Sequence, residues 1–137
     1  MAVLTSLFFL WGFITVLNDV LVPHWKELFE LSYFESLLVQ LCFFAAYGVG
    51  ALLYYSLSIT SGDPIARIGY KRGMIIGALI AAAGCALFVP ASWAGSYAAH
   101  LFALFILGSG FTLLQIAANP FVAIIGPAEG ASSRLNL

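Results

Sequence analysis

Residues 98–124 read AAHLFALFILGSGFTLLQIAANPFVAI, an apolar stretch without a Lys, Arg, Asp or Glu. About 20 apolar helical residues, each rising about 1.5 Å, cross the roughly 30 Å hydrocarbon core of a bilayer. A helix is expected because lipid offers backbone groups no hydrogen-bond partner. The stretch therefore predicts a transmembrane helix.

Three further stretches of the same kind precede it, at residues 4–23, 37–58 and 74–93. The chain is 63% hydrophobic and 8% charged, whereas soluble domains average about 45–50% and about 25%. This composition excludes a soluble domain, and the alternation of a membrane β-barrel is absent. We expect an all-α polytopic membrane bundle of four transmembrane helices. Residues 90–97 leave room for only a short turn, so the last two helices are expected to be antiparallel neighbours.

Basic residues predict the orientation of the bundle, because short loops rich in Lys and Arg stay cytoplasmic. Arg67, Lys71 and Arg72 lie between the second and third spans, and Arg134 follows the fourth. Lys26, after the first span, is accompanied by three acidic residues. Both termini are therefore predicted to be cytoplasmic. The absence of a basic run argues against nucleic acid as a partner, and no Cys or His pair has metal-ligand spacing, so no metal site is predicted.

Asp19 is the only carboxylate within a predicted span. An ionisable side chain at membrane depth costs about 2.5–3.5 kcal/mol on insertion scales, so it needs a partner or water. Thr15, Asn18 and Asp19 are expected to share one helical face that looks into the bundle or a water-filled path. We interpret Asp19 as a proton-titrating or substrate-binding carboxylate. The alternative is simple solvation near the outer interface, one turn before Pro23.

The fourth span carries a small and polar stripe, Gly108, Thr112, Gln115 and Asn119. Interhelical hydrogen bonding explains Thr112. Gln115 and Asn119 are candidates for binding a neutral polyol, since amides both donate and accept hydrogen bonds. Pro120 frees backbone carbonyls beside them.

The second span places Gln40, Tyr47 and Tyr54 on one face at seven-residue intervals, and Gln40 is the candidate ligand contact. Gly48 and Gly50 are expected to permit close helix approach.

The third span reads as a packing helix, because small residues line one side of it. His24 and His100 lie near predicted interfaces, where a solvated histidine is expected rather than a proton relay. The small residues of the third span are Gly73, Gly77, Ala81 and Gly84.

The loop at residues 62–73, GDPIARIGYKRG, resembles the G-x-x-x-D-R-x-G-R-[RK] loop that joins helices two and three in the major facilitator superfamily. Ala66 stands where the superfamily usually has Asp, and Asp63 lies three residues earlier. The resemblance implies a conformational loop made by Gly62, Arg67, Gly69, Lys71 and Arg72.

A longer likeness covers nearly the whole chain. The segments FFLWGF (8–13), LNDVLVP (17–23), AANPF (117–121) and SRLNL (133–137) resemble, in the same order, the fucose permease and glucose/galactose transporter family of sugar symporters. That family implies a twelve-helix fold of two six-helix halves, with the sugar bound between them and coupled to a proton or another cation such as sodium.

The resemblance also implies roles for particular residues. Asp19 falls on the family's helix-one carboxylate, which is needed for substrate and proton coupling. Gln115 stands where the fucose permease branch carries Glu, which favours the glucose/galactose branch. The candidate sugar contacts are Asn18, Gln40, Gln115 and Asn119, with Trp11 expected to stack on the apolar face of the sugar.

Twelve spans with their loops need on the order of 400 residues, so the chain is expected to be the amino-terminal third of a transporter. Its predicted partners are a sugar, the lipid bilayer and the remaining carboxyl-terminal helices, with no cofactor beyond the coupling cation. The predicted location is the bacterial inner membrane.

Two alternatives remain open from the sequence. One is a small four-helix exporter that acts as a dimer, and the other is a truncated membrane protein that does not transport. An enzyme is not expected, because no nucleophile, base or metal ligand accompanies the lone intramembrane carboxylate.

Overall fold

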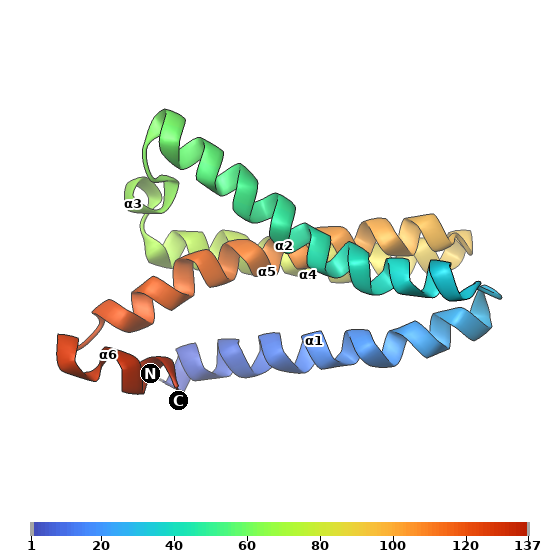
Figure 1. Ribbon diagram of the computed structural model, residues 1–137, viewed down its shortest axis with the longest axis horizontal. Helices are drawn as coiled ribbons and strands as arrows, with labels where there is room; N and C mark the ends of the chain where they lie inside the picture. Colours follow the sequence, from blue (N-terminus) through green and yellow to red (C-terminus); the bar gives the residue numbers. More distant parts are fainter. Residues whose placement is uncertain (1, 137) are drawn as a thin grey trace.

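The computed structural model describes residues 2–136 of the chain, and the described part is helical without strands. This confirms the all-α prediction. Four long helices are joined by short segments (Figure 1). Their bounds are α1 Ala2–Leu28, α2 Tyr33–Ser61, α4 Tyr70–Ala94 and α5 Tyr97–Ile124, with the short elements α3 Pro64–Ile68, η1 Ala128–Gly130 and α6 Ala131–Leu135. Leu137, the last residue of the SRLNL segment, lies outside the described residues.

All four long helices are long and apolar enough to cross a membrane. They contain 27, 29, 25 and 28 residues, and at about 1.5 Å per residue each exceeds the roughly 30 Å core of a bilayer. The predicted spans lie inside them. Helix α1 continues through Pro23 and α4 through Pro90.

The turn between α4 and α5 is shorter than the sequence suggested, because residues 90–94 are still helical. Only Gly95 and Ser96 separate the two helices. Gly95 ends α4 in the left-handed region at φ 57°, which glycine adopts at little cost. The side chain of Ser96 accepts a hydrogen bond from Ala99 N at 3.3 Å and so begins α5.

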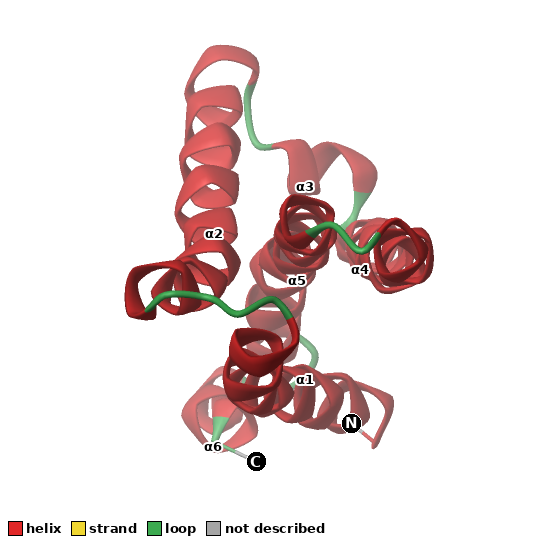
Figure 2. Cartoon of the chain, turned by 90° about the vertical axis from the view of Figure 1, so that its right-hand side faces the viewer, coloured by secondary structure: helices red, strands yellow, loops and turns green. Residues whose placement is uncertain are grey.

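Helices α4 and α5 form a closely packed antiparallel pair, as expected (Figures 1 and 2). The expected small-residue seam of α4 is buried against α5. A Cβ added to Gly84 would lie 2.5 Å from Leu107 N, and one added to Gly77 would lie 2.7 Å from Leu114 N. Such distances leave no room for a larger side chain, so the prediction of α4 as a packing helix is confirmed.

Helix α5 is the most buried of the long helices and α1 the least. Viewed along the bundle, α5 lies between α2 and α4 (Figure 2). A Cβ on Gly50 of α2 would lie 2.8 Å from Thr112 Cγ2, whereas one on Gly48 would have nothing within 4 Å. The expected close approach therefore holds for Gly50 and is wrong for Gly48.

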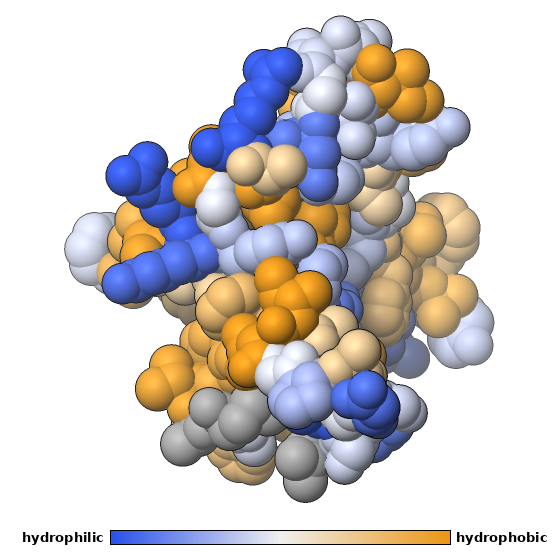
Figure 3. Space-filling view, turned by 90° about the vertical axis from the view of Figure 1, so that its left-hand side faces the viewer, coloured by the Kyte–Doolittle hydropathy of each residue, from blue (hydrophilic) through white to orange (hydrophobic). Residues whose placement is uncertain are grey.

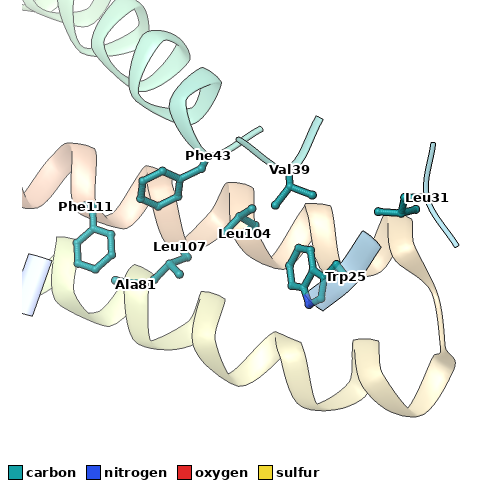
Figure 4. Close-up of a cluster of buried hydrophobic side chains, with 8 residues drawn as sticks. All are labelled: Trp25, Leu31, Val39, Phe43, Ala81, Leu104, Leu107 and Phe111. Carbon is teal, nitrogen blue, oxygen red and sulfur yellow. The ribbon is translucent and has the colours of Figure 1, made fainter. Parts of the chain in front are cut away.

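A hydrophobic core joins the helices and runs from the end where α1 meets α2 to the middle of α4 and α5 (Figure 4). Trp25 of α1 packs against Phe88 of α4 and His100 of α5, and Tyr97 donates a hydrogen bond to the carbonyl of Glu35 at 2.6 Å. The core residues are Trp25, Leu31, Val39, Phe43, Ala81, Leu104, Leu107 and Phe111.

Large apolar side chains are also exposed on all four long helices, including Phe9, Leu52, Leu79 and Phe102. Soluble proteins rarely expose apolar area on this scale, so these faces fit a lipid environment or further helices.

Most of the basic side chains gather at the end opposite to the core, where α3 and α6 lie together with both described ends of the chain (Figure 1). Arg67, Lys71 and Arg72 are exposed there, and a view onto this end shows hydrophilic side chains (Figure 3). This common end is the one predicted to be cytoplasmic.

Candidate functional site

The inward face of α1 repeats every seven residues. Leu4, Asn18 and Trp25 are buried and Trp11 is half-buried. Seven residues are close to two helical turns, so these four side chains form one stripe. Asn18 is thus the polar member of an otherwise apolar and aromatic stripe that faces the bundle.

A series of hydrogen bonds connects Asn18 and Asp19 of the first predicted span with Gln40 of the second. Asn18 Nδ2 donates to Gln40 Oε1 at 2.7 Å, and Gln40 Nε2 donates to Asp19 Oδ1 at 2.7 Å. Gln40 of α2 therefore bridges two successive residues of α1.

Asn18 and Asp19 differ sharply in exposure. Asn18 is 2% exposed, whereas Asp19 is exposed and Thr15 half-buried. Successive helical residues are about 100° apart, so the expected common face is divided: the amide points into the bundle and the carboxylate lies at its edge. The Thr15 hydroxyl donates to Trp11 O at 2.9 Å, within its own helix.

The carbonyl oxygen of the Asn18 side chain is buried and has no hydrogen-bond partner in the described part of the chain. An unpaired buried acceptor typically costs about 1–3 kcal/mol. This unpaired atom marks the buried end of the hydrogen-bond chain.

A second group of polar residues surrounds a pocket of about 370 Å³ between α2 and α5. Within residues 2–136, no hydrogen bond engages the side-chain amides of Gln115 and Asn119. Thr112, by contrast, donates to Gly108 O at 2.9 Å and contacts Ala46 O at 3.4 Å, which agrees with a packing role. The lining residues are Tyr47 and Ala51 of α2 with Thr112, Gln115, Ile116, Asn119 and Pro120 of α5.

Pro120 interrupts the backbone hydrogen bonding of α5 beside this pocket. It lies inside α5 and has no N–H to donate to the carbonyl of Ile116, four residues earlier. Ile116 lines the same pocket. The pocket therefore offers the two side-chain amides, beside a backbone carbonyl that proline leaves without its helical donor, and amides suit a ligand with several hydroxyl groups.

A hydrogen bond joins the inward stripe of α1 to a residue that lines the pocket. The indole Nε1 of Trp11 donates to the hydroxyl of Tyr47 at 2.6 Å, and Tyr47 lines the pocket. Gln40 and Tyr47 are seven residues apart on α2, about 10 Å along the helix. Asp19 is not among the residues that line the pocket. Asp19 and the pocket are both next to α2, at different positions along that helix.

The loop between α2 and α4 contains the short helix α3, whose N-cap is Asp63. Asp63 accepts hydrogen bonds from the hydroxyl of Tyr54 and, at 2.9 Å, from Ile65 N. The Tyr54 hydrogen bond is the main cause that holds the pKa of Asp63 below its ordinary value, and backbone hydrogen bonds lower it further. Asp63 therefore stabilises the loop locally.

The predicted loop residues have distinct positions. Arg67 donates to the carbonyl of Ser61, and Gly62 and Gly69 have φ of 79° and 84°, the region that favours glycine. Lys71 and Arg72 are exposed in the first turn of α4.

The expectation that His100 is solvated is wrong, because this side chain is 4% exposed. Its ring lies 5.2 Å from Trp25 and 5.1 Å from Phe29, both edge to face. His100 Nδ1 lies 2.8 Å from Ser96 O. The ring therefore helps to hold α1 against α5. His24 is exposed, as expected.

The sequence reasoning missed the pairing of Trp11 with Tyr47 and the burial of Asn18 against Gln40. The seven-residue repeat of Leu4, Trp11, Asn18 and Trp25 was the available signal, because it marks the face of α1 that packs.

The helices and their inward polar groups define a polytopic, all-helical membrane protein. The chain is 53% identical over 134 residues, 98% of its length, to the glucose/galactose transporter of Brucella abortus biovar 1 (strain 9-941). It is 39% identical over 136 residues to the L-fucose-proton symporter of Escherichia coli (strain K12) and 33% identical over 133 residues to that of Haemophilus influenzae (strain ATCC 51907 / DSM 11121 / KW20 / Rd), covering 99% and 97% of the chain.

The chain is therefore a homologue of bacterial proteins named glucose/galactose transporter and L-fucose-proton symporter. It spans 31%, 30% and 29% of the length of these three relatives. These relatives are named as transporters or symporters and not as enzymes, in agreement with the prediction that an enzyme is not expected. Four apolar helices and bacterial relatives also support an integral protein of the bacterial inner membrane. No family model and no solved structure matches the chain.

Proposed function

We propose that the chain forms the amino-terminal four helices of a twelve-helix sugar/cation symporter that works by alternating access. The observation that carries this proposal is the 53% identity to a glucose/galactose transporter across 98% of the chain. In such a carrier two halves rock around a central site. The remaining carboxyl-terminal helices would complete the second wall of that site.

We propose a hexose of the glucose or galactose type as the substrate. Identity is higher to the glucose/galactose transporter than to the fucose symporters, and Gln115 stands in place of the Glu of the fucose branch. A volume of about 370 Å³ lies within the usual range of small-molecule sites, about 300–1,000 Å³. The unengaged amides of Gln115 and Asn119 would bind sugar hydroxyls.

Trp11 would present its ring to the apolar face of the sugar. The hydrogen bond from its Nε1 to Tyr47 fixes the plane of the indole before any ligand arrives, which lowers the entropic cost of binding. Asn18 and Gln40 contribute to the site through α1 and α2, near the coupling residue.

Asp19 would be the residue that takes the coupling ion, and a proton is favoured over sodium. Gln40 turns its Nε2, a hydrogen-bond donor, toward Asp19. A sodium ion requires several oxygen ligands, as hard cations do, whereas Asp19 is the only carboxylate within a predicted span. A proton needs only the carboxylate itself. The name of the Escherichia coli relative specifies proton symport for that protein.

The four-helix exporter is less well supported. A dimer that exchanges a cation for protons calls for an acid well inside a span, whereas Asp19 lies near the end of the predicted span at residues 4–23 and is exposed at the bundle edge.

The test is Asp19→Asn in the complete carrier, meaning the longer transporter that includes these residues. Where the gene encodes only this chain, the carrier is a chimera in which the chain replaces the matched third of the Brucella abortus transporter. Galactose-driven proton uptake into proteoliposomes should be lost, because the proton acceptor is gone. Glu27→Gln, which neutralises another α1 carboxylate, should leave uptake intact. Unaltered uptake in Asp19→Asn would refute the coupling role.

Gln115→Glu tests the sugar site. We expect selectivity to move toward fucose and uptake to acquire a new pH dependence. If neither changes, Gln115 is not in the site.

A further inference from the structure

The charge on Asp19 dictates how the neighbouring amides are oriented. An ionised carboxylate only accepts hydrogen bonds, so Gln40 must direct its Nε2 toward Asp19 and its Oε1 toward Asn18. Asn18 must then donate from Nδ2. The side-chain oxygen of Asn18 is left over, and it is the atom that lacks a partner.

A protonated Asp19 keeps an acceptor oxygen but gains a hydroxyl donor, which makes the opposite set of hydrogen bonds possible. Its hydroxyl would donate to Gln40 Oε1, which requires a half-turn of the Gln40 amide about its last torsion. Gln40 Nε2 would then face Asn18 and donate to its oxygen. The unpaired group at the buried end would become the NH₂ of Asn18, with the atoms of all three side chains staying in place apart from the two amide half-turns.

We propose that Gln40 is a positioning residue that couples the orientation of the Asn18 amide to the protonation state of Asp19. The unpaired buried group of Asn18 is then an acceptor when Asp19 is charged and a donor when Asp19 is neutral. This inference rests on the proposed proton coupling at Asp19. The proton binds from water to the exposed carboxylate of Asp19. It changes the hydrogen bonding of Asn18, which lies about one-third of a helical turn away and points into the bundle.

The buried end needs an external partner in the charged state. Helical backbone N–H groups are already used within their own helices, so only an incoming O–H or N–H can satisfy the oxygen of Asn18. A hydroxyl group has this chemistry and can also accept from the NH₂ of the neutral state. The partner is therefore a sugar hydroxyl or a water molecule.

Other titratable groups on the packed helices are engaged elsewhere. On α2, Glu35 binds Ser32 at its own helix start, and Tyr47 accepts from Trp11. Cys42 donates to Leu101 O. On α5, His100 lies between Ser96 and the aromatic rings of α1. On α1, the charged or titratable His24, Lys26 and Glu27 are exposed beyond Pro23.

The experiment measures the affinity of the complete carrier for galactose by calorimetry across pH. Binding linked to one proton changes by at most about tenfold per pH unit. We expect this dependence in the wild type and its loss in both Asp19→Asn and Gln40→Met, with no further change in the double variant. Ser56→Ala, which removes only a hydroxyl bonded to Leu52 O on the same helix, should keep the wild-type profile.

Gln40→Glu guards against a merely structural effect of the Met variant. The new carboxyl group beside Asp19 would share its proton, as paired carboxyl groups do, so the pH midpoint of binding should move upward. Two results would overturn the proposed role of Gln40 and leave the coupling role of Asp19 intact. One is an unchanged pH midpoint in Gln40→Glu. The other is a pH dependence that Gln40→Met keeps while Asp19→Asn loses it. A pH dependence that survives in Asp19→Asn refutes the proposed coupling itself.

Asn18→Leu separates the two hydroxyl sources. If a sugar hydroxyl meets Asn18, galactose affinity falls at every pH. If water meets it, affinity at the optimum is kept and only the pH dependence is lost. A variant that retains both affinity and pH dependence contradicts the proposed role of Gln40.

Discussion

The indole Nε1 of Trp11 donates a hydrogen bond to the hydroxyl of Tyr47 at 2.6 Å, across 36 residues of sequence. The bond connects the least buried long helix, α1, to the wall of the α2–α5 pocket. The orientation of the Trp11 ring is therefore set by a residue that also faces the pocket.

Tyr47→Phe removes this acceptor and keeps the ring. Loss of one such hydrogen bond is worth about 0.5–1.5 kcal/mol, so galactose affinity of the complete carrier should fall by about two- to tenfold. Calorimetric titration checks this, with the exposed Tyr55→Phe on the same helix as control. Equal affinities for the two variants would show that the bond does not position Trp11 for binding.

Gly84→Ala should destabilise the α4–α5 pair. The added methyl group would lie 2.5 Å from Leu107 N, and overpacking of this kind costs about 1–3 kcal/mol. Gly48→Ala is the matched control, since a Cβ there has nothing within 4 Å and Ala favours the helix by about 1 kcal/mol. The free energy of unfolding of the purified protein in detergent should be highest for Gly48→Ala, intermediate for the wild type and lowest for Gly84→Ala. The reverse order would mean that the seam is not closely packed in the membrane protein.

The Asp63 cap should make the α2–α4 loop sensitive to acid. The pKa of Asp63 is lowered in the folded loop from its ordinary value of 3.8, so its contribution is present above pH 3.8 and lost as pH falls through the lowered pKa. Hydrogen exchange at Ile65, whose N–H Asp63 accepts, should accelerate below about pH 3.8 after correction for intrinsic rates. Tyr54→Phe should move this transition to higher pH, because it removes the main cause of the lowering. An identical transition in Tyr54→Phe would contradict the cap.

Arg134→Ala should release the segment after α5. Its guanidinium donates to Val122 O at 3.0 Å, Ala123 O at 2.7 Å and Pro127 O at 3.0 Å, which satisfies carbonyls at the end of the helix. Limited proteolysis should cut residues 124–131 faster in the variant. Arg134→Lys should rescue only in part, because an ammonium lacks the planar fork of donors. Full protection in Arg134→Ala would show that the segment is held by other contacts.

Much of the fold could be predicted because its causes are local in sequence. Apolar length fixed the expectation of four helices, and the spacing of Gly77, Ala81 and Gly84 located the face of α4 that packs. The helix ends were harder, since α1 continues through Pro23 and α4 through Pro90 although proline removes a helical hydrogen bond.

The candidate site could be predicted only as a set of residue types. Gln115 and Asn119 do line one pocket, as their stripe suggested. The seven-residue repeat could have shown that Asn18 points inward, but its pairing with Gln40 could not be read from spacing, because that pairing depends on where α2 lies. The burial of His100 depends on Trp25 of α1 and on Phe29 in the turn that follows α1, both far from His100 in sequence.

The bond between Gln40 and Asp19 has a consequence for synthesis. The carboxylate emerges from the ribosome 21 residues before its amide partner, an interval of about 1–4 s at about 5–20 residues per second. During that interval the first helix would meet lipid with its acid unmatched. We therefore expect the insertion machinery to retain α1 until α2 follows, and to release the two into the bilayer as a hairpin.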